Sequence, residues 1–314
     1  MYMTDLQSRR AADSAKVRIL GYGACAIAGC LWGTGFYFGK LALMEMSVSH
    51  MVLYRFLFAS IAFLPIVVLH PARLNRSEWR VLLIASFLGI PVQFLVQFYG
   101  LSITTVSHAS LMVGTMPVFL AVGAVLFAGE RLEPLGWFAL AGSTVGAALI
   151  VLGGSRTATG HGPSLSGDLL VVFSMAVALA WVLMNKQMMR THSPLVVTAY
   201  GILTGTAMLI VIVIAKSGMP PVHGVSGRAW LALAASGFLC TATTTLLWNW
   251  GIHHVPASRA GVFLNIEPAL GSWLGVKLMG DHLGPHAWVG AALILTAAVT
   301  LTTRGNQETP MVLE

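Results

Sequence analysis

Long apolar stretches separated by short polar segments run along the whole chain. A helix needs about 20 mostly apolar residues to cross the roughly 30 Å hydrocarbon core of a bilayer, and ten stretches meet this criterion. In the first half they are Ile19–Leu41, Val48–Leu69, Val81–Tyr99, Val106–Ala128 and Leu135–Gly153. In the second half they are Leu169–Met189, Leu195–Ala215, Trp230–Gly251, Ala257–Met279 and His286–Thr303. The pattern predicts ten transmembrane helices in two sets of five.

Composition supports this interpretation. Hydrophobic residues make up 56% of the 314 residues and charged residues only 9%, whereas soluble domains carry about 25% charged residues. A water-soluble globule is therefore excluded, and the alternation typical of barrel strands is absent. We expect an all-α integral membrane protein. Its three cysteines, Cys25, Cys30 and Cys240, lie in apolar stretches and are expected to pack between helices rather than to form a disulfide.

The two halves of the chain repeat each other without a gap. Every matched pair lies 151 positions apart, as the numbers of Trp79 and Trp230 show. The other pairs are Gly100 with Gly251, Ser107 with Ser258, Pro117 with Pro268, Gly129 with Gly280, Pro134 with Pro285 and Trp137 with Trp288. Internal repeats in an apolar chain are typical of secondary transporters. Because five is an odd number, the second half must enter the membrane from the opposite side, so the sequence predicts inverted repeats.

The expected organisation is a cytoplasmic N-terminal segment (1–18), a first five-helix repeat (19–153), a linker rich in Gly, Ser and Thr (154–166), a second five-helix repeat (167–303) and a cytoplasmic tail (304–314). Lys and Arg favour the cytoplasmic side of a membrane. With the N-terminus inside, twelve of them fall in inner segments and five in outer ones. This bias predicts both termini in the cytoplasm and a place in the cell (inner) membrane. It also accounts for the net charge of +7 without a nucleic-acid partner.

Residues in both halves resemble a known family. The matching features are Pro117 before Gly129–Glu130, Glu267–Pro268 before Gly280–Asp281, LWGTGFYFGKLAL from Leu31 to Leu43 and YRFLFASIAFLP from Tyr54 to Pro65. In this order, the chain after Ile19 resembles the EamA-type branch of the drug/metabolite transporter superfamily. Asp281 departs from the Glu that the family commonly has. The resemblance implies two EamA-like repeats and export of small metabolites such as amino acids or drug-like compounds, without naming the solute.

Ionisable groups inside a bilayer are costly, so function is the first hypothesis for them. Only Arg55 and Glu267 sit well inside expected spans, about 20 Å and about 15 Å from the inner face at 1.5 Å per residue. They either form a buried ion pair that fixes helix packing or provide a coupling site. In the second case Glu267 is a protonatable carboxylate or a ligand for a charged substrate. For Arg55, packing or snorkelling is favoured. Glu130 and Asp281, at span ends, are expected to be structural caps.

Polar and aromatic residues near mid-depth or at the outer span ends are the substrate candidates, because rings with a few amides suit an organic solute. The expected substrate-binding residues are Trp32, Gln93, Tyr99, His108, Trp181, Asn185, Asn265 and Glu267. Pro117 and Pro268 each remove a backbone hydrogen bond at matching places and are expected to break their helices beside a central site. Gly-xxx-Gly spacings predict close helix contacts, and the pair Gly142 and Gly146 is also a candidate dimer face.

The expected partners are a small-molecule substrate and the lipid bilayer, and the oligomeric state is monomer or homodimer. No cofactor, metal or enzymatic activity is expected. An intramembrane enzyme would need a catalytic constellation such as His-Glu-x-x-His, which is missing. A channel would need charged rings or a carbonyl-rich filter. A nucleotide-sugar or phosphorylated-metabolite carrier of the same superfamily is the alternative. It is disfavoured because Arg55 alone among basic residues lies deep in a span.

Overall fold

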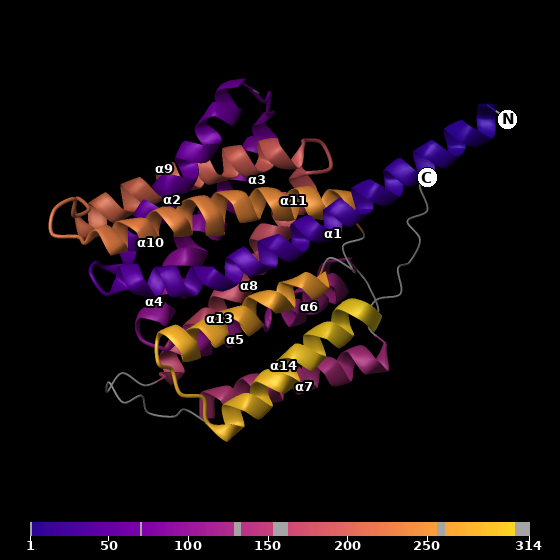
Figure 1. Ribbon diagram of the computed structural model, residues 1–314. Coiled ribbons are helices and arrows are strands. Elements are labelled where there is room, and N and C mark those ends of the chain that lie inside the picture. The colour runs from indigo at the N-terminus through magenta and orange to yellow at the C-terminus, as the bar shows by residue number, and fades with distance from the viewer. Residues whose placement is uncertain (1, 70, 129–132, 153–162, 256–260, 305–314) are drawn as a thin grey trace.

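The computed structural model describes residues 2–69, 71–128, 133–152, 163–255 and 261–304, and every element in these ranges is a helix (Figure 1). The first half contains α1 (Tyr2–Leu43), α2 (Val48–Leu69), α3 (Arg76–Phe87), α4 (Gln93–Ser102), α5 (Val106–Val113), α6 (Met116–Ala128) and α7 (Pro134–Leu152). The second half contains α8 (Leu165–Met188), α9 (Pro194–Ser217), α10 (Gly227–Gly237), α11 (Thr244–His254), α13 (Ile266–Leu278) and α14 (Pro285–Arg304).

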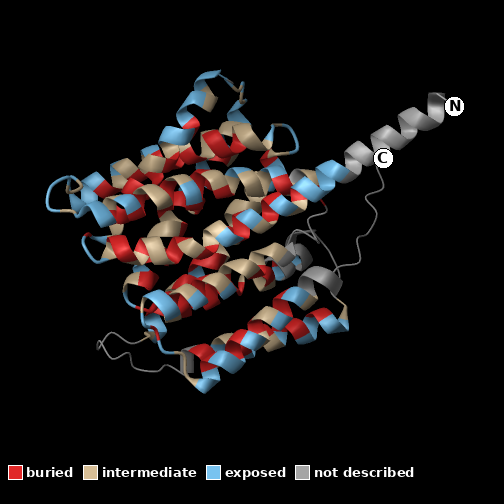
Figure 2. Cartoon of the chain, in the orientation of Figure 1, coloured by how far each residue is buried: buried red, intermediate tan, exposed pale blue. Residues whose placement is uncertain are grey.

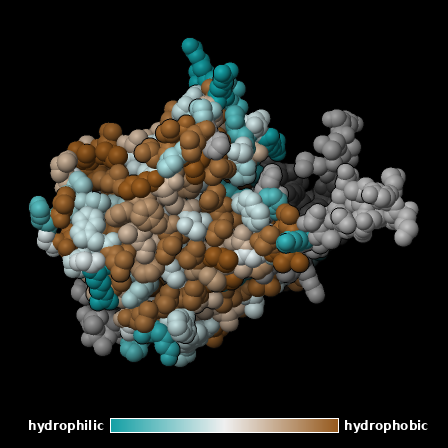
Figure 3. Space-filling model, turned by 45° about the horizontal axis from the view of Figure 1, so that its top comes forward, coloured by the Kyte–Doolittle hydropathy of each residue, from teal (hydrophilic) through white to brown (hydrophobic). Residues whose placement is uncertain are grey.

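Within the described residues, six helical runs are long and apolar enough to cross a membrane by length and composition. They are Lys16–Leu43, Val48–Leu69, Arg76–Ile103, Leu165–Met188, Pro194–Ser217 and Gly227–Ile252. Three shorter apolar helices cover Val106–Phe119, Pro134–Ile150 and Pro285–Thr300. Figure 3 shows hydrophobic side chains over most of one face, with hydrophilic ones mainly at its margins. Large apolar side chains such as Phe138, Leu126 and Val211 are exposed, as expected where lipid replaces water.

Contacts between the halves follow the repeat. Helix α2 packs on α9 and α7 on α14, so each of these elements meets its own counterpart, and α5 packs on α13, the counterpart of α6. The contact of α1 with α11 is matched by the contact of α8 with α4. Figure 1 shows α7 and α14 side by side at one edge of the bundle, while the N-terminal part of α1 projects beyond it. The two halves are therefore interleaved rather than stacked as separate domains.

Small residues permit the closest of these contacts. A Cβ atom on Gly146 would lie 2.6 Å from the carbonyl oxygen of Gly290 on α14. Gly33 on α1 lies against Glu267 and Leu270 of α13 in the same way. The fifth span thus uses Gly146 to pack within the chain, whereas a Cβ on Gly142 would meet nothing within 4 Å.

Buried residues recur along the helices of the bundle, whereas exposed residues are frequent at the helix ends (Figure 2). The largest cluster joins α1, α2, α4 and α5 and includes Phe36, Met51, Phe98 and Leu111. Phe98 of this cluster also contacts the guanidinium of Arg55, which is described below.

The third helical run of each half contains a π turn at a corresponding position. In the first half it is η1 (Leu88–Val92), and in the second it is η2 (Phe238–Thr243). Pro91 has no N–H to donate, which disturbs the regular ladder in η1. In η2 there is no proline, and the Thr241 hydroxyl donates to the carbonyl oxygen of Ser236 at 2.9 Å. Such π turns occur frequently at functional sites.

The helical path also breaks beside both prolines of the repeat. Helix α5 ends at Val113, and α6 begins at Met116, one residue before Pro117. In the second half the 3₁₀ segment η3 (Gly261–Asn265) passes into α13 two residues before Pro268. Each proline therefore lies in the first turn of a helix, where its missing N–H leaves no hydrogen bond unmade.

Candidate functional site

The guanidinium of Arg55 lies inside the bundle, with 4% of the residue exposed. Its Nε donates to Thr241 Oγ1 at 2.7 Å, and its Nη2 donates to the carbonyl oxygen of Cys240 at 3.2 Å. Both acceptors belong to η2, so Arg55 ties α2 to the π turn of the other half. Within the described ranges, Nη1 has no hydrogen-bond partner.

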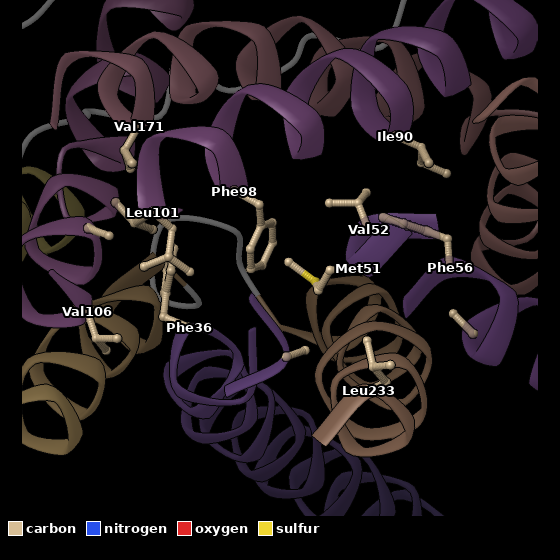
Figure 4. Packing of buried hydrophobic residues seen from close by; sticks show 14 of the residues in the cluster. Phe36, Met51, Val52, Phe56, Ile90, Phe98, Leu101, Val106, Val171 and Leu233 are labelled. Carbon is tan, nitrogen blue, oxygen red and sulfur yellow. The ribbon is translucent and has the colours of Figure 1, made fainter. Parts of the chain in front are cut away.

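Aromatic rings enclose this cation. The Arg55 Cζ atom lies 5.0 Å from the ring centroid of Phe94 and 5.1 Å from that of Phe98. Phe98 also stacks on Phe36 with centroids 6.1 Å apart, and Figure 4 shows its ring among Phe36, Met51 and Leu101. A desolvated cation on aromatic faces gains about 2 kcal/mol. One side of the guanidinium is therefore held by apolar rings.

Glu267 lies in the first turn of α13 and is half-buried. Its charge interacts with that of Arg55 across the bundle. Among described residues, however, no N–O distance of 4.0 Å or less joins the two groups as an ion pair. Asn265, which was expected near it, is buried at the start of the same helix. The structure thus brings opposite charges into one region without joining them.

Trp32 lies on α1 and Trp181 on α8. Trp32 packs on Trp248 of α11 with ring centroids 5.4 Å apart. The ring of Trp181 covers Gly89 in η1, where an added Cβ would lie 2.7 Å from the indole Nε1. Both indoles are half-buried. Each therefore contacts the third helical run of the opposite half.

Two amides accompany these rings. Gln93 is 7% exposed, and its buried Oε1 has no hydrogen-bond partner in the part of the chain that the structure describes. Asn185, one turn beyond Trp181 on α8, is half-buried. Asn249, which the sequence analysis did not select, donates from Nδ2 to Thr198 Oγ1 at 2.5 Å. An unpartnered buried acceptor such as Gln93 Oε1 is suited to a ligand.

His108 lies in a different polar group, with Asp168 on α8. Its Nδ1 is 2.9 Å from Asp168 Oδ2, and Thr104 Oγ1 donates to Oδ1 of the same carboxylate at 2.6 Å. His108 and Asp168 are each 1% exposed. Lys40 Nζ donates to the carbonyl oxygens of Leu101 and Thr104, both at 2.7 Å. We call His108, Asp168, Thr104 and Lys40 the outer cluster, because they gather near the ends of their helices. No hydrogen bond among the described residues joins it to Arg55.

The remaining expected residues are dispersed. Tyr99 is 55% exposed, with its side chain at the surface. Asp281 accepts a hydrogen bond on Oδ2 from the backbone N–H of Ser107 at 2.8 Å, and so caps α5 of the other half rather than the next helix. Glu130 lies outside the described residues. No group of three His, Cys, Asp or Glu side chains that could hold a metal occurs among the described residues.

Sequence reasoning missed Asp168, Thr241 and Trp248. Asp168 immediately precedes the expected sixth span, and its position in the first turn of a helix was the available signal. Thr241 lies in an apolar run, and nothing local to it indicates a partner 186 positions away.

These features define an integral, multi-pass helical membrane protein. The EamA-like transporter family matches residues 19–152 and again 165–303, and the chain belongs to this family. A solved crystal structure covers 92% of this chain and 96% of its own, with a TM-score of 0.64 and 19% identity, which indicates the same fold.

Relatives by sequence carry transporter names. An uncharacterised transporter of Archaeoglobus fulgidus is 24% identical over 275 residues, 87% of this chain and 93% of its own. The uncharacterised transporter YyaM of Bacillus subtilis is 24% identical over 85% of this chain and 88% of its own. A probable terminal-alkyne amino-acid exporter of Streptantibioticus cattleyicolor is 26% identical over 62% of this chain and 64% of its own.

Proposed function

We propose that this EamA-family transporter exports small organic metabolites across the cytoplasmic membrane by alternating access. Ten spans form two inverted five-helix repeats around a central site, with both termini in the cytoplasm. The observation that carries the proposal is the symmetry of the contacts between the halves. The contact of α1 with α11 corresponds to the contact of α8 with α4. Interleaved repeats of this kind can rock against each other around one central site.

The proposed substrate site lies between Trp32, Trp181 and Glu267, with Gln93, Asn185 and Asn265 as polar neighbours. Both indoles lie where one repeat meets the broken third run of the other. Tyr99 and His108 belong to the outer end of the path, because one is exposed and the other is bound to Asp168. The amino-acid exporter among the relatives supports amino acids as the first solutes to test.

Flux measured with purified protein in proteoliposomes tests the function. Efflux of radiolabelled amino acids and of amphipathic drugs is compared with that from protein-free vesicles. Trp32→Ala is expected to reduce transport at least tenfold, whereas Trp273→Ala, whose ring is exposed on α13, is expected to preserve it. Flux that is equal in both variants, or absent from the folded wild type for every solute, contradicts the proposal.

Reporter fusions test the topology separately. A reporter after Arg156 is expected outside and one after Arg190 inside. The same side for both would mean that the stretch Leu169–Met189 between them does not cross the membrane once, so that the expected span count is wrong.

A further inference from the structure

We propose that Lys40 holds an outer gate closed. Its ammonium group ties the outer end of α1 to the junction between α4 and α5, and these contacts open when the solute leaves. This inference rests on the proposed alternating-access function and adds the device that closes one end of the path.

The first observation is the place where the Lys40 ammonium binds. Lys40 lies in the last turn of α1, and its Nζ donates to the carbonyl oxygens of Leu101 and Thr104, both at 2.7 Å. Leu101 lies in the last turn of α4, and Thr104 lies between α4 and α5. The last carbonyl groups of a helix have no partner inside it and carry the negative end of its dipole. A cation from another helix is therefore favoured here, and it fastens α1 to this junction.

The second observation is that the junction is bonded to α8 on its other side. Thr104 Oγ1 donates to Asp168 Oδ1 at 2.6 Å and accepts from the backbone N–H of Ser164 at 3.4 Å. Helix α4 packs along α8, whereas α1 packs chiefly on α11 and α13. Lys40 therefore links α1 to the pair formed by α4 and α8, at the end of the bundle that the proposed topology turns outward.

The third observation is that the repeat does not require this cation. Val255 is the counterpart of Thr104, because the two lie 151 positions apart. There a Cβ atom on Gly21 of α1 would lie 2.7 Å from Cγ1 of Val255, which belongs to an apolar cluster with Cys25. Apolar packing thus joins α1 to the end of α11, whereas a hydroxyl and an ammonium act at the end of α4. The polar fastening is a property of the outer end.

The fourth observation is that the Lys40 contacts can be exchanged for water. Lys40 is half-buried, and its charge is attracted by that of Asp281, which accepts a hydrogen bond from the backbone N–H of Ser107 at the start of α5. A long Lys side chain near a helix end can turn its ammonium group to the aqueous interface. Because hydrogen bonds to water replace those to the carbonyl oxygens, the net free-energy change is small. The contacts therefore favour the closed arrangement and still permit opening.

Distances between spin labels test the gate without any solute. Met44, just beyond α1, and Ser166 on α8 are exposed, so a cysteine at each position can carry a label in a chain whose three native cysteines are replaced. Double electron–electron resonance in lipid nanodiscs gives the distribution of the distance between the labels. Lys40→Met keeps an unbranched side chain but removes the charge and the donors. It is expected to raise the population at longer distance at least about threefold, because the closed arrangement alone loses these bonds.

Two further variants make the result specific. Lys216→Met is the matched control, since Lys216 lies in the last turn of α9 and is exposed, and its distribution is expected to equal that of the background protein. Asp281→Asn keeps an acceptor for Ser107 but removes the charge that attracts Lys40, and is expected to give a smaller shift in the same direction.

An unchanged distribution in folded Lys40→Met overturns the gate, and so does an equal shift in Lys216→Met. If Lys40→Met does not fold, the distribution of Asp281→Asn decides, and its equality with the background overturns the proposal. Efflux from proteoliposomes tests transport separately: its absence in the folded wild type counts against the proposed function, whereas efflux with unchanged distances counts against the gate alone.

Discussion

Two buried polar regions of the molecule differ in how completely their charges are matched. In the outer cluster, both oxygens of Asp168 have partners, in Thr104 and His108, and Lys40 binds two carbonyl oxygens, so that among the described residues only Nε2 of His108 lacks a partner there. In the central region, Arg55 retains unused donors and Glu267 stays apart from it. A matched set of buried charges fixes the packing of helices. An unmatched set at the meeting point of the two repeats is what a ligand site requires.

The two π turns show a similar contrast, because they share the same backbone geometry but differ in the side chains that contact them. The turn η1 is covered by the indole of Trp181 against Gly89 and contains Pro91. Its counterpart η2 is held by the cation of Arg55 and by the hydroxyl of Thr241. The repeat therefore reproduces the backbone while changing the chemistry, and polar chemistry is concentrated at the second turn.

The largest effect on stability is expected at the outer cluster. Asp168→Ala leaves the hydroxyl of Thr104 and Nδ1 of His108 without their acceptor, which costs about 3–5 kcal/mol for a buried pair broken on one side. Thermal unfolding of the purified protein measures this loss. Ser166→Ala, at an exposed position in the same helical turn, is the control and is expected to stay within about 0.5 kcal/mol of wild type. Equal unfolding temperatures for Asp168→Ala and wild type would show that the cluster does not hold α5 to α8.

A smaller loss is expected in the central region. Thr241→Val preserves the shape but removes the acceptor for Arg55 Nε and the donor to Ser236, with an expected cost of about 1–3 kcal/mol. The matched control is Thr296→Val, because that exposed hydroxyl donates only within its own helix and its loss is expected to stay within about 0.5 kcal/mol. Thermal unfolding of both variants is compared at one detergent concentration. If the two substitutions cost the same, Arg55 does not depend on η2 for its position.

Much of the fold was predictable for two reasons. The length of an apolar stretch can be read from the local sequence, and the repeat appears when the chain is aligned with itself. The second helix has the predicted bounds, Val48–Leu69, and two matches to one family follow the repeat. The π turns were not predictable, because a span that is apolar on all sides gives no periodic signal when the hydrogen-bond register shifts by one residue. The ten-span inverted topology stays a prediction.

For the candidate site, the sequence predicted only the depth of Arg55 and Glu267 in the membrane. A rise of 1.5 Å per residue brought Arg55 and Glu267 to similar levels, but it carries no information on the direction in which each side chain points across the bundle. For the same reason the partners Thr241 and Asp168 were missed. Both are recognised through contacts between segments far apart in the sequence.

The smallest effect is expected for a carboxylate that makes comparable hydrogen bonds at the surface. Glu45, between α1 and α2, accepts from the backbone N–H of Ser226 at 2.7 Å and from its hydroxyl at 2.6 Å. The hydroxyl bond, followed by the backbone bond, lowers the pKa of Glu45 below the ordinary value of 4.5, because both favour the charged form. A carboxylate whose pKa is lowered by folding stabilises the protein above its unfolded pKa, and this contribution disappears as the pH falls through the folded pKa.

The difference in unfolding temperature between wild type and Glu45→Gln is therefore expected to be constant near neutral pH and to shrink below about pH 4.5. Ser226→Gly retains the N–H that donates to Glu45 and the capping position of α10, so it should lose part of the effect and keep the same pH dependence. The effect should also be smaller than that of Asp168→Ala at every pH, since water competes for hydrogen bonds at an exposed site and is excluded from a buried one. A difference that grows on acidification would contradict the assignment of Glu45 as the titrating group, and a loss as large as that of Asp168→Ala would remove burial as the reason for the contrast between the two carboxylates.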